Sequence, residues 1–410
     1  MESKVYFHID VNSAFLSWEA VYRLKSGDES TVDIRNIPSA VGGDVAKRHG
    51  IILAKSIPAK KYGIVTGESI QEALRKCPSL LIVPPNHELY KKYSDAFIKV
   101  LEDYSPDIEQ FSVDEAFMDV TGTRRLFGEP IDLAHTIKDR IRDELGFTVN
   151  IGISDVKLLA KMASDFKKPD MIHTLYLAEI KEKMWPLPVE DLFFVGKSTK
   201  DKLYAMGIKT IGELANTDKN ILLSNLKSHG ELIWNIANGI DVSNLHSKTE
   251  KNKGYGNSTT VAVDITESES AKIVLLSLCE TVTKRLREDK VRGELITITI
   301  KDNNFHSYSH QKQINYPTNS TSDIFDYAQV IFNEMWDGTP IRLLGVSVGK
   351  LQGLDDAIQM SLFDNDLHSK REACDNAIDK IREKFGEGAI KRATSIDNHI
   401  KHKNFPKGMS

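Results

Sequence analysis

The chain has 410 residues, of which 40% are hydrophobic and 27% charged, and its formal net charge is −4. These values are typical of an ordinary soluble protein with several domains, and no stretch approaches the ~18 consecutive apolar residues of a membrane span. The three cysteines, Cys77, Cys279 and Cys374, are scattered without a CxxC spacing, which argues against a disulfide framework or a zinc site and indicates a reducing cytoplasm.

The N-terminal part of the chain alternates between strand and helix patterns. Alternating apolar residues predict a strand that ends at Asp10, and Ser13 suits the cap of a helix that follows. By the same reasoning strands are expected at residues 5–10, 105–121 and 148–154, and helices at residues 14–24, 130–145 and 154–168, the last one stopped by Pro169. This order predicts an α/β sheet domain with residues 18–84 inserted near its start.

The C-terminal part has two further regions. Short helices separated by glycine turns are expected from 186 to 240, and a polar linker follows them. A compact α+β domain is then expected, with β-rich stretches at 255–266 and 294–314, a strand at 341–351, and helices at 269–290 and 323–336. The chain ends with a turn-rich segment and an amphipathic helix.

Three carboxylates, Asp10, Asp114 and Glu115, stand at a strand end or in an expected hairpin. Two-metal phosphoryl transfer needs acidic oxygens that hold two Mg²⁺ ions ~3.5–4 Å apart, and Mg²⁺ keeps several waters, so few carboxylates suffice. Because side chains alternate along a strand, Asp114 and Glu115 can share one site only near a turn, or by reaching the ions from different sides. The alternative is a solvated hairpin, which the apolar flanking residues disfavour.

Five motifs follow one another along the chain: HIDVNSAF, SVDEAFMDVTG, NIGIS with KLLAKMASDFKKP, a helix–glycine–helix run, and GNSTT. In this order they resemble the motifs of the Y-family DNA polymerases, the DinB/UmuC group. The resemblance covers residues 4 to about 351 and implies a multidomain α+β right-hand polymerase. Its parts would be a palm (1–11 and 85–170), small fingers (12–84), a helical thumb with a helix-hairpin-helix (171–241), a linker (242–253), a little finger of βαββαβ type (254–351), and a C-terminal tail (352–410).

The resemblance implies a template-directed DNA polymerase of low fidelity that acts in translesion synthesis and DNA repair without proofreading. Asp10, Asp114 and Glu115 would be its catalytic metal ligands, and the backbone carbonyl of Val11 a fourth. The cofactor would be two Mg²⁺ ions, with Mn²⁺ as a substitute. Phe15 matches the steric gate, an aromatic ring that collides with a 2′-hydroxyl, whereas the alternative is a core aromatic on an amphipathic helix.

Lysines are the expected partners of the triphosphate and the DNA backbone. Lys157, Lys161 and Lys168 are spaced by 4 and 7, so on one helix they would project within ~40° of one direction; the alternative is a solvated charged face. The resemblance gives Lys168 a triphosphate role. Lys60 matches a phosphate-binding arginine of the fingers, and lysine keeps the charge but loses the bidentate fork. Ile57 stands where relatives often have tyrosine, which indicates an altered, more UmuC-like phosphate grip.

Other residues are expected to contact DNA or proteins. Gly196 and Gly207 lie in the helix-hairpin-helix pattern, where glycines let backbone N–H groups approach phosphates, although Phe194 replaces the first glycine. Arg292 belongs to a basic cluster of the little finger, and a solvated helix end is the alternative there. Residues 359–363 resemble the peptide that docks bacterial polymerases on the sliding clamp, with Gln359, Leu362 and Phe363 as its anchors.

The expected partners are therefore primer-template DNA, dNTP, the sliding clamp and accessory repair proteins, for a cytoplasmic monomer. Three alternatives stay open. The first is a UmuC-like catalytic subunit that needs partner proteins, the second is a non-catalytic DNA- or clamp-binding scaffold, and the third is another palm enzyme such as a nucleotidyl cyclase. A requirement for DNA in turnover would exclude the cyclase, and loss of function in an Asp114 variant would exclude the scaffold.

Overall fold

The structure is a computed structural model that describes residues 4–27, 31–43, 50–241, 252–354, 356, 365–386, 388–390 and 392. These residues form two compact units, one built from residues 4–43 and 51–241 and the other mainly from residues 252 onward. Within the described ranges, none of the helices combines the length and the apolar character that crossing a membrane requires.

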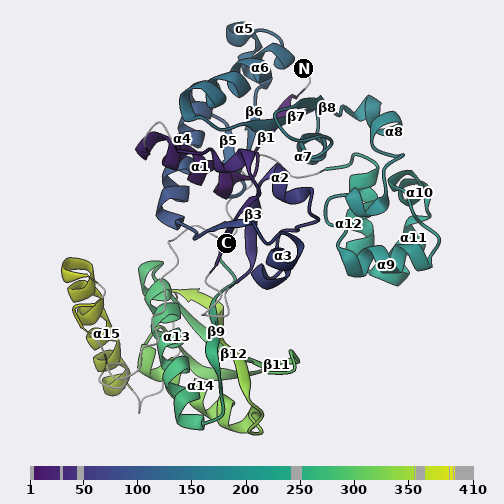
Figure 1. Ribbon diagram of the computed structural model, residues 1–410. Helices are drawn as coiled ribbons and strands as arrows, with labels where there is room; N and C mark the ends of the chain where they lie inside the picture. Colours follow the sequence, from purple (N-terminus) through teal and green to yellow (C-terminus); the bar gives the residue numbers. More distant parts are fainter. Residues whose placement is uncertain are drawn as a thin grey trace. The chain divides into compact units, whose positions relative to one another are not determined.

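A five-stranded sheet in the order β5-β6-β1-β7-β8 forms the centre of the first unit (Figure 1). Its strands are β1 (Tyr6–Val11), β5 (Ile108–Gln110), β6 (Glu115–Asp119), β7 (Val149–Ser154) and β8 (Ile172–Thr174). β1 pairs antiparallel with β6 and β7, and β7 pairs parallel with β8. Residues 105–121 contain the hairpin expected at Asp114 and Glu115 and are not one continuous strand, because the N–H groups of Phe111 and Ser112 both bond to the carbonyl of Glu115 and turn the chain back.

Helices cover the sheet and extend its core. They are α1 (Ala14–Ser26), α4 (His87–Glu102), α5 (Arg124–Phe127), α6 (Pro130–Arg140), continued by a π-helical turn (Ile141–Leu145), and α7 (Lys157–Ser164). α7 packs on β1 and β7, and α1 packs on α4. The shared core includes Phe7, Ile9, Trp18, Phe97 and Ile151, all fully buried.

α7 is shorter than the helix expected at 154–168. The side-chain amide of Asn150 donates to the carbonyls of Ser164 and Lys167 at 3.0 and 2.7 Å, which holds the chain in a non-helical path after Ser164. Lys168 also precedes Pro169, and the proline ring disfavours a helical conformation at the residue before it. Lys168 therefore does not belong to the same helix as Lys157 and Lys161.

The segment between α1 and α4 forms a small sheet of its own, in the order β3-β2-β4. Its elements are β2 (Ser39–Gly42), β3 (Ile52–Lys55), α2 (Ile57–Lys60), α3 (Ile70–Lys76) and β4 (Leu81–Val83). A separate buried cluster that includes Ile52, Ile64 and Ile70 holds it together. α1, by contrast, packs into the core of the large sheet, since Leu16, Trp18 and Val21 are buried there.

The region after β8 is helical, as the glycine-punctuated pattern predicts. It contains α8 (Ile180–Lys183), α9 (Lys197–Ala205), α10 (Ile211–Asn216), α11 (Lys219–Leu226) and α12 (Ser228–Ala237). Thr210 caps α10 in a capping box with Glu213. Leu203, Ile211, Leu214, Leu222 and Ile233 are fully buried between these short helices.

The second unit has the element order βαββαβ that the resemblance implies. It contains β9 (Gly254–Ile265), α13 (Ser268–Glu288), β10 (Val291–Asp302), β11 (Ser307–Thr318), α14 (Thr321–Met335) and β12 (Ile341–Gly353), with the antiparallel sheet order β11-β10-β12-β9. The β-rich stretch expected at 294–314 is thus a hairpin of two strands. α13 and α14 pack together against the sheet (Figure 1).

The C-terminal helix α15 (Asn365–Phe385) packs on α14, and charged side-chain pairs connect it to the rest of the second unit. Arg287 of α13 donates to Asp379 at 2.6 Å and lies 3.6 Å from Asp375, with only 7% of its side chain exposed. Asp375 also accepts the backbone N–H of Thr321 at 2.7 Å, at the start of α14. α15 therefore provides partners for buried polar groups of the two-helix layer.

Replacing Asp375 by alanine is expected to destabilise the second unit. The change leaves the buried Thr321 N–H without its acceptor and removes one partner of Arg287, which lowers the free energy of unfolding by about 1–3 kcal/mol. Urea unfolding followed by circular dichroism measures the change. Glu383→Ala, at an exposed position of the same helix, is the matched control, and an equal effect of both substitutions would contradict the assignment.

Candidate active site

Strand pairing brings the three carboxylates of the sequence analysis together. Asp10 is the cross-strand partner of Glu115 in the β1–β6 pair. Asp114 lies at the end of the β5–β6 hairpin, and its backbone carbonyl accepts the N–H of Val11 at 3.0 Å. Its carboxylate accepts the hydroxyl of Ser112 at 2.6 Å. Asp114 and Glu115 are therefore neighbours beside a turn, which is one of the two arrangements that would let both serve a single site.

The carboxylates repel one another in a partly buried setting. Burial, with smaller contributions from the charges of Glu115 and Asp114, raises the pKa of Asp10 to about 7 against the opposing charge of Lys168. Burial also raises the pKa of Asp114, and the charge of Glu115 adds to this. A divalent cation would relieve this repulsion, so the oxygen donors fit Mg²⁺. Within the described ranges, no three Asp, Glu, His or Cys side chains already stand in the geometry of a metal cage.

Two lysines neutralise these carboxylates. Lys161 of α7 donates to Glu115 at 2.5 Å, and Lys168 lies 3.1 Å from Asp10 and 2.8 Å from Asp165. Burial alone would raise the pKa of Glu115, but the nearby His8 ring, 3.4 Å away, and the hydrogen bond from Lys161 lower it to about 2. Glu115 is thus ionised and paired with a cation in this structure.

The lysine row expected on α7 is not a solvated face. The side chains of Lys157 and Lys161 are only 8% and 7% exposed. Lys157 bonds to both oxygens of Glu109 at 2.7 Å and lies over the ring of Phe117. Contact of these two lysines with DNA stays a prediction, and it requires that each exchange a carboxylate partner for a phosphate.

His8 is a site residue that the sequence analysis missed. It is fully buried, and its Nε2 lies 3.4 Å from a carboxylate oxygen of Glu115, while Nδ1 lies 2.8 Å from the hydroxyl of Ser164. Burial lowers its pKa. The strand periodicity contained the signal, because His8 is two residues before Asp10 and shares its face of β1.

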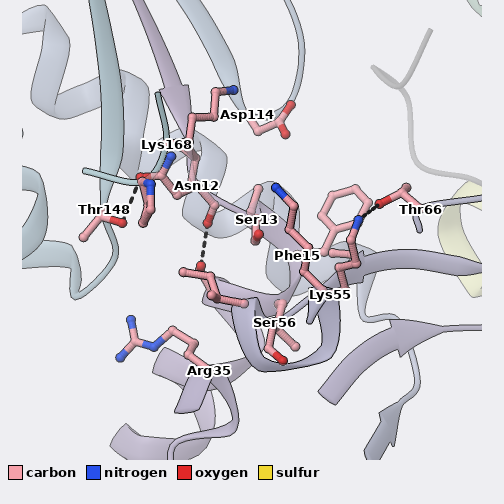
Figure 2. Close-up of a pocket in the computed structure, with 18 of the residues that line it drawn as sticks. Asn12, Ser13, Phe15, Arg35, Lys55, Ser56, Thr66, Asp114, Thr148 and Lys168 are labelled. Atoms are coloured by element: carbon pink, nitrogen blue, oxygen red, sulfur yellow. Dashed lines mark hydrogen bonds between the residues drawn. The ribbon is translucent and has the colours of Figure 1, made fainter. Parts of the chain in front are cut away.

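A cavity of about 450 Å³ lies beside the carboxylates. Asp10, Asp114 and Lys168 line it, together with Phe15 near the start of α1 (Figure 2). The ring of Phe15 stacks on that of Tyr90 with 4.4 Å between centroids and an angle of 10°. Phe15 therefore belongs to the cavity wall and is backed by a second ring, which fits the gate assignment better than the core alternative.

The small sheet contributes the opposite kind of charge to this cavity. Lys60, which the sequence analysis singled out, lines it, and so do Lys55 and Arg35, which it did not. The guanidinium of Arg35 is held by Asp33 and by the carbonyl of Gly146. Ile57 also lines the cavity and is 54% exposed.

The expected DNA-contact residues lie in different parts of the fold. Gly196 precedes the first residue of α9, and Gly207 follows its end with φ +82°, a conformation that glycine adopts without strain. Phe194 has φ +72° although it is not glycine, and its ring is 48% exposed. A bulky residue in this conformation is uncommon and strained.

In the second unit, Arg292 makes a two-pronged pair with Glu372 of α15 at 2.9 and 3.1 Å. A phosphate would have to displace this carboxylate, so DNA contact by Arg292 stays a prediction. The expected clamp peptide, Gln359 to Phe363, lies outside the described residues.

Magnesium binding is expected to strengthen as the pH rises through about 7. The metal binds the carboxylate form of Asp10, whose pKa burial raises to about 7, so below that pH a proton must leave before the ion binds. Affinity should fall by up to about tenfold per pH unit on the acid side. Isothermal titration with Mg²⁺ at about pH 6 and about pH 8, in two buffers of different ionisation enthalpy, measures affinity and proton release. An affinity that does not change with pH would contradict this expectation.

The chain is similar to proteins of one family over nearly all of its length. The impB/mucB/samB family matches residues 9–165, its C-terminal domain matches residues 252–362, and the IMS family HHH motif matches residues 178–208. DNA polymerase IV of Clostridium acetobutylicum is 49% identical over 97% of this chain and 100% of its own length. DNA polymerase IV of Acetivibrio thermocellus is 39% identical over 96% and 98%. A Y-family DNA polymerase chimera of known structure has the same fold, with a TM-score of 0.72 and 20% identity over 85% of this chain and 99% of the chimera.

Proposed function

Because this chain belongs to the impB/mucB/samB family, the Y-family DNA polymerases, we propose that it extends a primer on a DNA template by two-metal nucleotidyl transfer at Asp10, Asp114 and Glu115. The family makes it a DNA-directed DNA polymerase. The observation that carries the proposal for the site is the pairing of Asp10 with Glu115 next to a cavity, which Asp10 and Asp114 line together with Phe15 and Lys168.

The proposed reaction joins the primer 3′-hydroxyl to the α-phosphate of a dNTP and releases pyrophosphate. Two bound Mg²⁺ ions would activate the hydroxyl and stabilise the charge of the triphosphate. The side chains of Asp10, Asp114 and Glu115 and the carbonyl of Val11 would hold them. Lys168 now pairs with Asp10, so in this scheme it exchanges that carboxylate for a phosphate oxygen when nucleotide binds. Lys161, which now bonds to Glu115, would likewise leave that carboxylate free to hold a metal ion.

Phe15 has a separate role in this scheme, the exclusion of ribonucleotides. Its ring is held against Tyr90, whose hydroxyl donates to Glu19 at 3.0 Å. A ring supported in this way can move little to make room for the 2′-oxygen of a ribonucleotide, since closely packed interiors resist extra volume.

We further propose that synthesis is of low fidelity, lacks proofreading and serves translesion synthesis. The three-stranded sheet between α1 and α4 is small, so few residues are available to test the shape of the nascent base pair. The sliding clamp, through residues 359–363, and accessory repair proteins are the proposed partners. A UmuC-like subunit that depends on such partners is the second candidate, favoured by Lys60 and Ile57 where relatives often carry arginine and tyrosine.

Primer extension by the purified chain tests this function. With Mg²⁺ and all four dNTPs, we expect distributive synthesis on undamaged templates and extension past an abasic site, and chelation of the metal should abolish both. DNA binding without extension would favour the partner-dependent candidate if clamp and accessory proteins restore synthesis. Failure to extend even with those proteins would favour the scaffold.

A further inference from the structure

Two lysines of the small sheet line the cavity from neighbouring elements. Lys55 is the last residue of β3, and Lys60 is the last residue of α2, five positions later. Figure 2 shows Lys55 rising beside Phe15, with its ammonium joined to Thr66, another residue of the cavity wall. The cavity thus has the carboxylates of Asp10 and Asp114 from the large sheet and these two lysines from the small one, in addition to Arg35, whose guanidinium Asp33 already pairs.

Neither cation has an acidic partner among the described residues. The ammonium of Lys55 donates to the hydroxyl of Thr66 at 3.2 Å, and no carboxylate of the described ranges makes an ion pair with Lys55 or Lys60. Lys161 and Lys168 differ in this respect, because carboxylates already neutralise them. Lys55 and Lys60 therefore carry positive charge that no carboxylate of the described residues neutralises in an ion pair.

The two ammonium groups also act on each other. Partial burial, followed by the charge of Lys60, lowers the pKa of Lys55, and Glu68 opposes this only weakly. Like charges held in one cavity are unfavourable unless a counter-charge joins them. An anion with several charged oxygens is the kind of ligand that relieves both, and a polyphosphate is such an anion.

We propose that Lys55 is a second binding residue for the triphosphate of the incoming nucleotide, which acts together with Lys60. This inference rests on the proposed polymerase function. It adds Lys55 to Lys60 and Lys168, the two lysines that the family motifs assign to the triphosphate. One lysine is a point charge and cannot grip two phosphate oxygens as an arginine fork does. Two lysines from adjacent elements supply the missing second contact, and the hydroxyl of Thr66 holds Lys55 in place before the ligand arrives.

Binding of inorganic tripolyphosphate to the full chain, measured by titration calorimetry without DNA, tests the phosphate contact directly. Lys55→Met should weaken this binding about tenfold, the scale of one charge-assisted contact, while Lys55→Arg keeps it within about threefold. Lys61→Met is the matched control, because Lys61 is exposed and lies next to Lys60 but does not line the cavity. Circular dichroism melting establishes that each variant folds.

Steady-state primer extension supplies the second readout. The KM for dNTP should rise by about the same factor in Lys55→Met, with kcat nearly unchanged, because the contact is made to substrate and transition state alike. A protein that extends primers but binds tripolyphosphate equally well with Lys55→Met and Lys61→Met would overturn the inference and leave the proposed function intact. So would a raised KM with unchanged tripolyphosphate binding, which would point to the template strand. Absence of all extension would count against the proposed function, and Lys55-dependent tripolyphosphate binding would then still stand.

Discussion

Asp114→Ala is expected to abolish primer extension while the protein stays folded. In the proposed reaction the carboxylate of Asp114 holds the metal ions, and the loss of a ligand removes several kcal/mol of transition-state stabilisation, or a fall of at least about 1,000-fold in kcat/KM. The measurement is single-nucleotide incorporation under single-turnover conditions.

The fold should tolerate this change for two structural reasons. The contact that fixes the hairpin to β1 is the bond from the N–H of Val11 to the backbone carbonyl of Asp114, which alanine retains. The side chain contributes one hydrogen bond, from Ser112, and burial raises its pKa, so its charge opposes folding at neutral pH. This destabilisation is absent below the pKa that the Asp114 carboxyl has in the unfolded chain, and it grows as the pH rises toward the higher pKa of the folded protein. The alanine substitution removes this destabilisation.

The matched control is Asp143→Ala. The side chain of Asp143 is 69% exposed, pairs with its neighbour Arg142, and does not line the cavity. The Asp143→Ala variant should extend primers at the rate of the unsubstituted protein. If Asp114→Ala also retained full extension, the carboxylate assignment would be wrong, and the family's activity would have to come from another site.

Phe15→Ala is expected to admit ribonucleotides. The ring of Phe15 lines the cavity and stacks on Tyr90, so it has little room to move away from the 2′-hydroxyl of a bound ribonucleotide. Forcing extra atoms into well-packed surroundings costs about 1–3 kcal/mol, which corresponds to about 5- to 150-fold in discrimination. Removal of the ring should lower the preference for dNTP over rNTP by that factor, measured as the ratio of kcat/KM values on one template.

Phe15→Tyr separates the gate from general damage, because it keeps the aromatic ring and should keep the discrimination. Incorporation of dNTP by Phe15→Ala serves as the internal reference, since only the ratio carries the argument. An alanine variant with unchanged sugar discrimination would mean that Phe15 is a packing residue of α1, the alternative that the sequence left open.

Much of the architecture follows from sequence patterns that act locally. The first strand, the helix from Ala14 and the strand expected at 148–154 are present within two residues of their expected bounds, because alternation and helical spacing report which face of an element is buried. The βαββαβ order of the second unit also appears as the motif resemblance implies. Alternation did not locate the turns of the hairpins. Two short strands joined by a tight turn have the same hydrophobic alternation as one long strand, so the pattern alone did not fix where residues 105–121 and 294–314 divide, although a hairpin was expected at Asp114 and Glu115 and two adjacent strands in the βαββαβ order.

The sequence by itself determined the class of enzyme, because three carboxylates, an aromatic residue at position 15 and basic residues in a family order are properties of residue identity and spacing. Only the tertiary structure decided which groups neutralise one another. His8 beside Glu115, Lys161 on the same carboxylate, Lys168 outside α7 and Lys55 in the cavity all depend on contacts between elements distant in the chain. Periodicity shows which face of an element is buried but not which side chain lies opposite it, and electrostatic energy depends on that distance.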